Sequence, residues 1–277
     1  MATIWYLPFI HTSPSGLSTI YTVLLRLVQI AEKLGQPHIL LTADFAIYSK
    51  AQQIIWNKPA SLEGKLTMRL GGMHLTMAYL ASIRKLYADG GLLSFLVDCD
   101  VYAPVTARLM LQGKQLFRGV PVMKLVLEAL FRLYYESLMK WQQQQDISKI
   151  DSEKLMKVVQ DIQHAFEAKD KVSAEQLTEK LELQYGSKFQ ALQLAFNAAG
   201  RPESATFAYW ETFMQGVDTL LKLLRAECDG LFELHLEAVC EVIPWCRAAD
   251  RRNYAKYLPV YLGDMKALEE KHPKSFQ

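Results

Sequence analysis

Short apolar runs alternate with helix-like segments over the first ninety residues, and this alternation constrains the fold more than any other feature. The runs 38–42 and 65–70 are typical of strands. Segments 17–34, 45–56 and 74–87 carry apolar residues at intervals of three and four, which is typical of amphipathic helices. Strands separated by helices in this order favour parallel pairing with crossover connections. We therefore expect an α/β fold, predominantly helical, built around a small sheet of two or three strands.

Within this sheet, segment 39–42 is expected to be the central strand and to be buried on both faces, with 65–70 beside it. Segment 4–10 is aromatic and β-prone, but Pro8 restricts it to an edge strand or an extended entry segment.

After Gly91 strand signals nearly vanish and the chain becomes almost continuously helical. We expect three regions: a partial α/β core at 1–90, an all-helical insertion at 91–200, and helices with a C-terminal arm returning to the core at 201–277. The glutamine run 142–145 and the polar residues after it are predicted to form a surface linker, followed by an exposed helical hairpin.

The C-terminal arm contains Tyr254, Tyr257 and Tyr261 next to Arg251 and other basic residues. A proline at position 259 is expected to interrupt any helix there. The arm is therefore expected to be a packed aromatic segment, and a base-stacking platform for nucleic acid is the alternative.

Composition excludes several classes of protein. Of 277 residues, 51% are hydrophobic and 22% are charged, which is typical of a globular chain with a sizeable core. Apolar residues never form a run of about 18, so no membrane-spanning helix is expected. The N-terminus lacks the pattern of a secretory signal, and we expect an intracellular protein, with the nucleus as one location open to it. The common nucleotide, zinc-protease and hydrolase motifs are absent.

Charge is unevenly distributed along the chain. Residues 1–140 contain 14 Lys and Arg against 8 Asp and Glu, a net charge of +6, whereas the remainder has 17 against 21, a net charge of −4. Lys114, Arg118 and Lys124 form the most basic local stretch, with Phe117 between them. These residues could contact a nucleic-acid backbone, and a solvated helical edge is the alternative.

The four cysteines, Cys99, Cys228, Cys240 and Cys246, contain no CxxC pair. Zinc knuckles need ligands paired at short spacing across a turn, and the gap between the last two cysteines lies in a helical pattern. Free, buried thiols are therefore expected.

Asp44 directly follows the first clear strand, at the sheet edge where ligands and catalytic groups gather in α/β folds. Its carboxylate could bind Mg²⁺ or Mn²⁺, or it could cap the helix that follows; the two roles are compatible. His74 follows a strand and a Gly-Gly break. It could have an auxiliary role in a site, and a structural role is the alternative.

Three segments carry a resemblance to a known family: LLTAD at 40–44, WNKP at 56–59 and MRLGGMH at 68–74. Their order resembles the second half of the RNase H-like core of DDE transposases, of which Mutator-like elements are the nearest comparison. The segments 34–59, 68–83 and 250–265 resemble uncharacterised, transposon-derived animal proteins as well. The resemblance implies a partial RNase H-like core and an ancestral, metal-dependent transfer of DNA strands.

The resemblance also implies a site. Asp44 matches the second catalytic Asp and would bind Mg²⁺ or Mn²⁺, and His74 matches a histidine that opens a helix. The third carboxylate should lie on a late helix, where we favour Glu237. Spacing alone does not separate it from the other three candidates, which are Glu227, Glu233 and Glu241.

Two departures weigh against activity. The first catalytic Asp of such enzymes lies before the region that matches, so we expect it to be missing here. Mutator-like enzymes also carry Cys two residues before the His, where this chain has Gly72. Two-metal chemistry needs carboxylates from separate elements, so the chain alone is expected to be catalytically incompetent.

Two other functions stay open. The helices of 141–199 could form a surface for protein partners, with the truncated core as scaffold. Alternatively, the chain could be a metal-dependent nuclease that is completed by other segments or by a partner.

Overall fold

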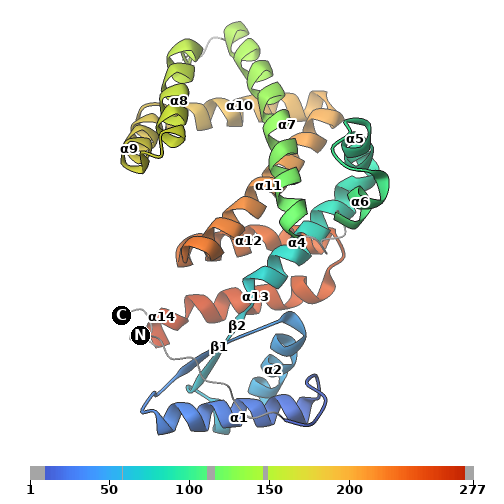
Figure 1. The fold of residues 1–277 in the computed structure, drawn as a ribbon, viewed down its shortest axis with the longest axis vertical. Coiled ribbons are helices and arrows are strands. Elements are labelled where there is room, and N and C mark those ends of the chain that lie inside the picture. Colours follow the sequence, from blue (N-terminus) through green and yellow to red (C-terminus); the bar gives the residue numbers. More distant parts are fainter. Residues whose placement is uncertain (1–9, 58, 111–115, 146–148, 272–277) are drawn as a thin grey trace. The chain divides into compact units, whose positions relative to one another are not determined.

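The computed structural model describes residues 10–57, 59–110, 116–145 and 149–271, and it is predominantly helical (Figure 1). The chain divides into two compact units. One comprises residues up to Val120 together with those from Gly216 onward, and the other comprises Pro121–Gln215. In the described part of the chain, none of the helices is long and apolar enough to cross a lipid bilayer.

The first unit contains the two strands and most of the short helices: α1 (Leu17–Lys33), β1 (Ile39–Ala43), α2 (Phe45–Asn57), α3 (Pro59–Leu62), β2 (Leu66–Leu70), α4 (Gly72–Tyr87), η1 (Ala88–Leu92), α5 (Leu93–Asp98), α6 (Pro104–Leu109), α12 (Phe232–Ala248), α13 (Arg252–Lys266) and α14 (Leu268–Lys271). The second unit contains α8 (Ser152–Glu167), α9 (Lys171–Leu181), η3 (Glu182–Gly186) and α10 (Ser187–Glu203). Two long helices run from one unit into the other, α7 (Leu116–Gln144) and α11 (Ala205–Asp229).

The strands β1 and β2 pair in parallel, in a register from Ile39 opposite Leu66 to Ala43 opposite Leu70. The predicted parallel pairing with a crossover through α2 is therefore confirmed. Among the described residues the sheet consists of β1 and β2. The candidate strand at 4–10 lies outside the described residues except for its last position.

The expectation that β1 is buried on both faces is wrong. Leu40 is 46% exposed, and alternate positions of β1 are exposed, whereas Leu66, Met68 and Leu70 of β2 are all buried. Successive side chains of a strand point to opposite faces, so a strand with one covered face exposes every second residue. An apolar run of five residues is too short to distinguish this arrangement from full burial.

Helix α1 buries one stripe of its surface in the core of the first unit. Ile20, Leu24, Val28 and Ala31 are between 1% and 5% exposed and recur at intervals of three and four residues. The helix ends where Gly35 adopts a positive φ of 70°, a conformation that costs glycine little.

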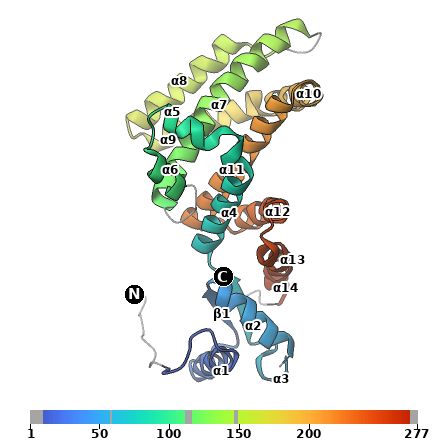
Figure 2. The ribbon, with the colours of Figure 1, turned by 90° about the vertical axis from the view of Figure 1, so that its right-hand side faces the viewer.

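Pro259 does not interrupt the C-terminal arm, in contrast to the expectation from sequence. Helix α13 continues through it, although proline removes one backbone hydrogen bond at a typical cost of about 3 kcal/mol. The proline itself is exposed, while Tyr257, Leu258 and Tyr261 on either side of it are at most 4% exposed. Packing against α12, with which α13 lies side by side in Figure 2, compensates for the lost hydrogen bond.

In the second unit, the glutamine run is not simply a surface linker. Gln142 is fully buried at the end of α7, where its amide donates to Ile150 O (3.1 Å) and accepts from Ile150 N (3.0 Å). The apolar core around it includes Tyr134, Leu138 and Phe196. The Gln142 amide thus supplies the hydrogen-bond partners of the Ile150 backbone, and its own polar atoms are satisfied in return. A polar side chain can be buried when it is hydrogen-bonded in this way.

Thiol burial also differs from expectation: Cys246 is buried, whereas Cys99, Cys228 and Cys240 are exposed. The four thiols are free, as expected. An amphipathic helix places cysteine on either face, because the residue is small and tolerates both environments.

A substitution in α1 tests the core. Leu24→Ala should lower the free energy of unfolding by roughly 2–5 kcal/mol, because it removes a side chain that is 1% exposed. Leu17→Ala on the same helix should change it far less, since Leu17 is 52% exposed. Chemical denaturation of both variants measures the difference, and equal effects would contradict this placement of α1.

Candidate functional site at the edge of the sheet

Asp44 follows β1 directly and caps α2. Its Oδ1 accepts a hydrogen bond from the backbone N–H of Ile47 at 2.8 Å, and its carbonyl accepts one from Tyr48 at 2.8 Å. The side chain is exposed. Asp44 therefore lies at the carboxyl end of the strand, as expected, and the structure shows it acting as an N-cap.

The second strand is followed by a glycine pair, Gly71 and Gly72, which extends the contact between β1 and β2 beyond the sheet. Gly71 N donates to Ala43 O at 2.8 Å. A Cβ built on Gly72 would overlap the carboxyl group of Glu227, which reaches this corner from the last turn of α11. A side chain such as that of cysteine therefore has no room at Gly72, because the Glu227 carboxyl group occupies the space.

Glu227 lies in a cluster of polar side chains from four elements. Arg69 of β2 holds both of its carboxylate oxygens at 3.3 Å. Nδ1 of His235 in α12 lies 2.7 Å from Oε1 of Glu227, although its N–H is not well aligned with that oxygen. His235 Nε2 lies 2.8 Å from the hydroxyl of Tyr261 in α13. We call these four residues the edge cluster: Arg69, Glu227, His235 and Tyr261.

Electrostatics favour the charged form of Glu227. The contact with His235 has the largest effect and lowers the pKa of Glu227, and the charge of Arg69 lowers this pKa further. Burial acts in the opposite direction and raises it. The first turn of α4 adds the positive end of a helix dipole beside the carboxylate. Burial raises the pKa of Tyr261 to about 12, so its hydroxyl keeps its proton.

The favoured third carboxylate, Glu237, lies elsewhere. It is exposed on α12, two positions from His235, and two positions correspond to about 200° around a helix. Because His235 faces the sheet edge, Glu237 faces away from it, beside Lys266 in a shallow surface pocket. The structure brings Glu227 to the edge instead.

The remaining candidates are not members of the edge cluster. Glu233 is exposed in the first turn of α12. Glu241 accepts hydrogen bonds from Thr219 at 2.6 Å and from Lys222 at 3.1 Å. His74 is exposed in the first turn of α4.

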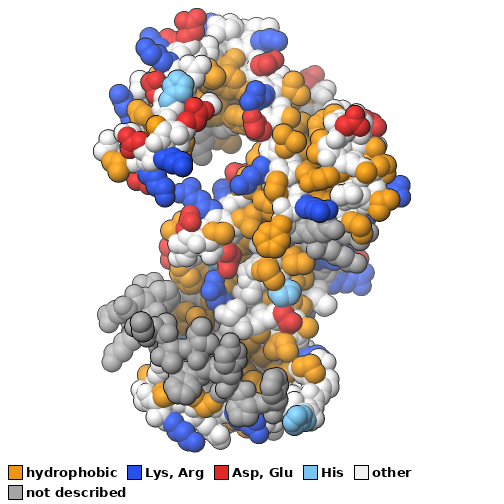
Figure 3. All heavy atoms as spheres, in the orientation of Figure 1, with side chains coloured by type: hydrophobic (Ala, Val, Ile, Leu, Met, Phe, Trp, Pro, Cys, Tyr) orange, Lys and Arg blue, Asp and Glu red, His pale blue; other side chains and the backbone are white. Residues whose placement is uncertain are grey.

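The predicted basic stretch is partly described. Lys114 lies outside the described residues, while Arg118 and Lys124 are both exposed on α7. Their separation of six positions directs them roughly 120° apart around the helix. On the face shown in Figure 3, Lys and Arg side chains are interspersed with Asp and Glu side chains.

The tyrosines of α13 pack against α2. The rings of Tyr254 and Phe45 are 4.3 Å apart, and Trp56 stacks on Tyr257 at 6.1 Å. Tyr257 and Tyr261 are buried. The packed aromatic arm is therefore what the structure shows, although it is helical, and these rings do not form an open platform for bases.

The carboxylate at the sheet edge already has partners within the protein. In the part of the chain that the structure describes, no group of three or more His, Cys, Asp or Glu side chains is arranged to hold a metal ion. The carboxylate nearest to the expected position, Glu227, already interacts with a guanidinium group and an imidazole. Its oxygens are therefore engaged in protein contacts.

Removing the charge of Glu227 tests the edge cluster. Glu227→Gln should lower the free energy of unfolding at neutral pH by roughly 1.5–3 kcal/mol, the typical value of a hydrogen bond to a charged group. The wild-type contribution should be complete above the ordinary Glu pKa of about 4.3 and should be lost as pH falls through the lower folded-state pKa. Thermal unfolding between neutral and acidic pH measures both effects.

Glu237→Gln is the matched control, since Glu237 is exposed. It should change the free energy of unfolding by no more than about 0.5 kcal/mol. A larger loss in Glu237→Gln than in Glu227→Gln would contradict the role given to the edge cluster.

Comparison with known proteins gives one relationship. No curated protein and no solved structure matches the chain. A family described as a domain of unknown function (DUF8702) matches residues 1–277, the whole of the sequence. The chain is therefore a member of the DUF8702 family.

Proposed function

We propose that the chain is a transposon-derived, RNase H-like protein whose sheet edge has a structural rather than a catalytic role. The order of elements supports the origin: a strand followed by Asp44, a helix, a parallel strand, and a helix that begins beside a glycine pair. A carboxylate from a late helix, Glu227, also returns to the carboxyl ends of the strands, where the resembling enzymes bind metal.

One observation carries the structural role: Arg69 and His235 hold the carboxylate of Glu227. A divalent cation at this carboxylate would lie next to a guanidinium group that is permanently charged. Binding would therefore require Glu227 to leave Arg69, and repulsion between the two cations would oppose it. The residues present do not fit a two-metal site, and strand transfer is not proposed for this chain alone.

A protein-binding role for the second unit is the second candidate. Several large apolar side chains on its helices are exposed to solvent: Met156, Phe166, Val172 and Leu183, at 43%, 62%, 64% and 87%. Exposed apolar side chains of this size are typical of surfaces that meet a partner when they lie together. Phe166→Ser with Leu183→Ser should leave thermal unfolding nearly unchanged while reducing any self-association measured by analytical ultracentrifugation.

DNA stays a predicted partner, supported by the exposed Arg118 and Lys124 of α7. Binding to a labelled DNA duplex should weaken as salt increases, because phosphate contacts release counterions. Binding that is equal in Arg118→Glu and the wild type would argue against this surface.

Metal titration and a DNA-cleavage assay test the main proposal. The purified chain should show neither saturable Mn²⁺ binding nor Mn²⁺-dependent nicking of supercoiled DNA. Asp44→Asn should lower the free energy of unfolding by about 0.5–2 kcal/mol, the cost of a weakened helix cap. Nicking that disappears in both Asp44→Asn and Glu227→Gln would overturn the proposal and assign both carboxylates to catalysis.

A further inference from the structure

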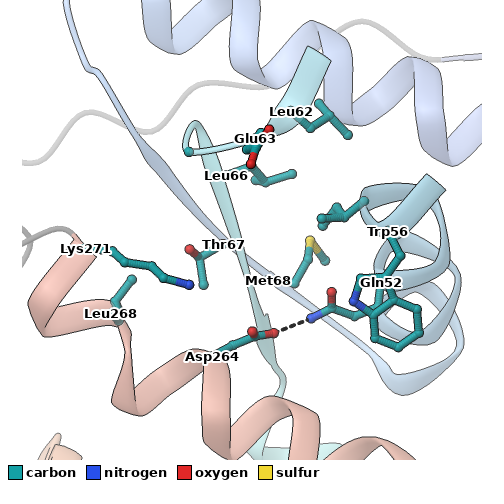
Figure 4. A pocket seen from close by; sticks show the side chains of 12 residues that line it. Gln52, Trp56, Leu62, Glu63, Leu66, Thr67, Met68, Asp264, Leu268 and Lys271 are labelled. Carbon is teal, nitrogen blue, oxygen red and sulfur yellow. Dashed lines mark hydrogen bonds between the residues drawn. The ribbon is translucent and has the colours of Figure 1, made fainter. Parts of the chain in front are cut away.

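A cavity of about 400 Å³ lies in the first unit, between α2, the turn before β2, β2 itself, α13 and α14 (Figure 4). Its volume is within the range of about 300–1,000 Å³ that is typical of small-molecule sites. The cavity is separate from the edge cluster and shares no residue with it.

Apolar and polar side chains share the lining of this cavity. Trp56 contributes a ring that is 52% exposed and is held in place by stacking on Tyr257. Met68 and Leu268, which are 1% and 4% exposed, belong to the walls as well. The exposed ring of Trp56 suits the hydrocarbon part of a ligand, because covering it removes apolar surface from water.

Asp264 supplies the most constrained polar group of the cavity. Its Oδ2 accepts a hydrogen bond from Nε2 of Gln52 at 2.8 Å, and Gln52 is 3% exposed and also donates to Tyr48. Burial raises the pKa of Asp264, while the hydrogen bond from Gln52 and the charge of Lys271 act in the opposite direction. The hydrogen bond from Gln52 thus orients the carboxyl group of Asp264. The neighbouring donor and positive charge do not fully offset the effect of burial on its charged form.

Lys271 directs its side chain into the same cavity from α14 (Figure 4). Its charge acts on Asp264, yet among the described residues no ion pair joins the two within 4.0 Å. Glu63 adds a second carboxylate to the lining. The charged side chains of the lining are thus two carboxyl groups and one ammonium group, and their sum is negative when both carboxyl groups are ionised.

We propose that this cavity binds a small organic cation, a primary amine with an apolar body, whose ammonium group pairs with Asp264. The apolar body lies along Trp56, Met68 and Leu268. The aromatic ring of Trp56 also attracts cations when they lie close to its face. Lys271 carries the same functional group as the ligand, so it competes with the ligand for Asp264. The proposal does not depend on the role of the sheet edge.

Calorimetric titration with hexylamine tests the proposal, with hexan-1-ol as the neutral probe of matching length. The full chain should bind hexylamine saturably and should bind hexan-1-ol at least tenfold more weakly. Asp264→Asn keeps the acceptor for Gln52 but removes the charge, and it should weaken hexylamine binding roughly tenfold or more. Lys271→Gln removes the competing ammonium group and should strengthen binding.

Asp264→Asn should weaken hexylamine binding and Lys271→Gln should strengthen it. These opposite effects distinguish binding in the cavity from general attraction to a charged surface. Asp229→Asn, an exposed carboxylate on α11, is the control and should not change hexylamine binding. Binding should also weaken as pH falls through the raised pKa of Asp264, which is above that of an ordinary Asp.

Thermal unfolding of each variant confirms that it is folded before it is titrated. Equal binding of hexylamine and hexan-1-ol would overturn the proposal. So would unchanged binding in a folded Asp264→Asn variant, weaker binding in Lys271→Gln, or no binding by the wild type.

Discussion

The structure of the first unit depends on the compensation of one partly buried carboxylate. Glu227 carries its charge at the end of α11, against the first turn of α4, and a buried charge is tolerated only when opposite charge and hydrogen-bond donors surround it. Arg69, His235 and Tyr261 extend this compensation to β2, α12 and α13. The relative positions of these elements are therefore coupled, since moving any of them changes the environment of the same charge.

Close packing around glycines reinforces this arrangement. A Cβ on Gly72 would overlap the Glu227 carboxyl group, and a Cβ on Gly216 would overlap the ring of Trp245. The ring of Trp245 meets that of Tyr79 edge to face, and the Tyr79 hydroxyl donates to Gly216 O at 3.0 Å. Helices α4, α11 and α12 thus approach closely at positions where any larger side chain would separate them.

The second unit is stabilised by buried polar networks of its own. Glu211 is 5% exposed and accepts hydrogen bonds from Arg201 (2.6 Å and 3.1 Å), Asn197 (3.0 Å) and Gln215 (2.6 Å). Tyr134 in turn donates to Asn197 at 2.8 Å. With its oxygens satisfied, this carboxylate has a structural role, as does the buried amide of Gln142. Networks of this kind favour one packing of the helices over alternatives.

Local pattern was enough to predict α1, β1, α2, β2 and α4. The periodic stripe containing Ile20, Leu24 and Val28 identified α1, the apolar runs identified β1 and β2, and their order predicted parallel pairing, because these features depend on spacing along the chain. The position of Asp44 at the end of a strand, and its role as a cap, followed from the same local rules.

Tertiary structure alone decided the rest. Four late glutamates had equivalent sequence signals, and only the paths of α11 and α12 brought Glu227 to the edge and directed Glu237 to solvent. Arg69, His235 and Tyr261 are separated by up to 192 positions, so no spacing rule could group them. Helix α13 continues through Pro259 because packing outweighs a local rule. Membership of a functional cluster depends on distances in space, and a single sequence specifies these only through the complete fold.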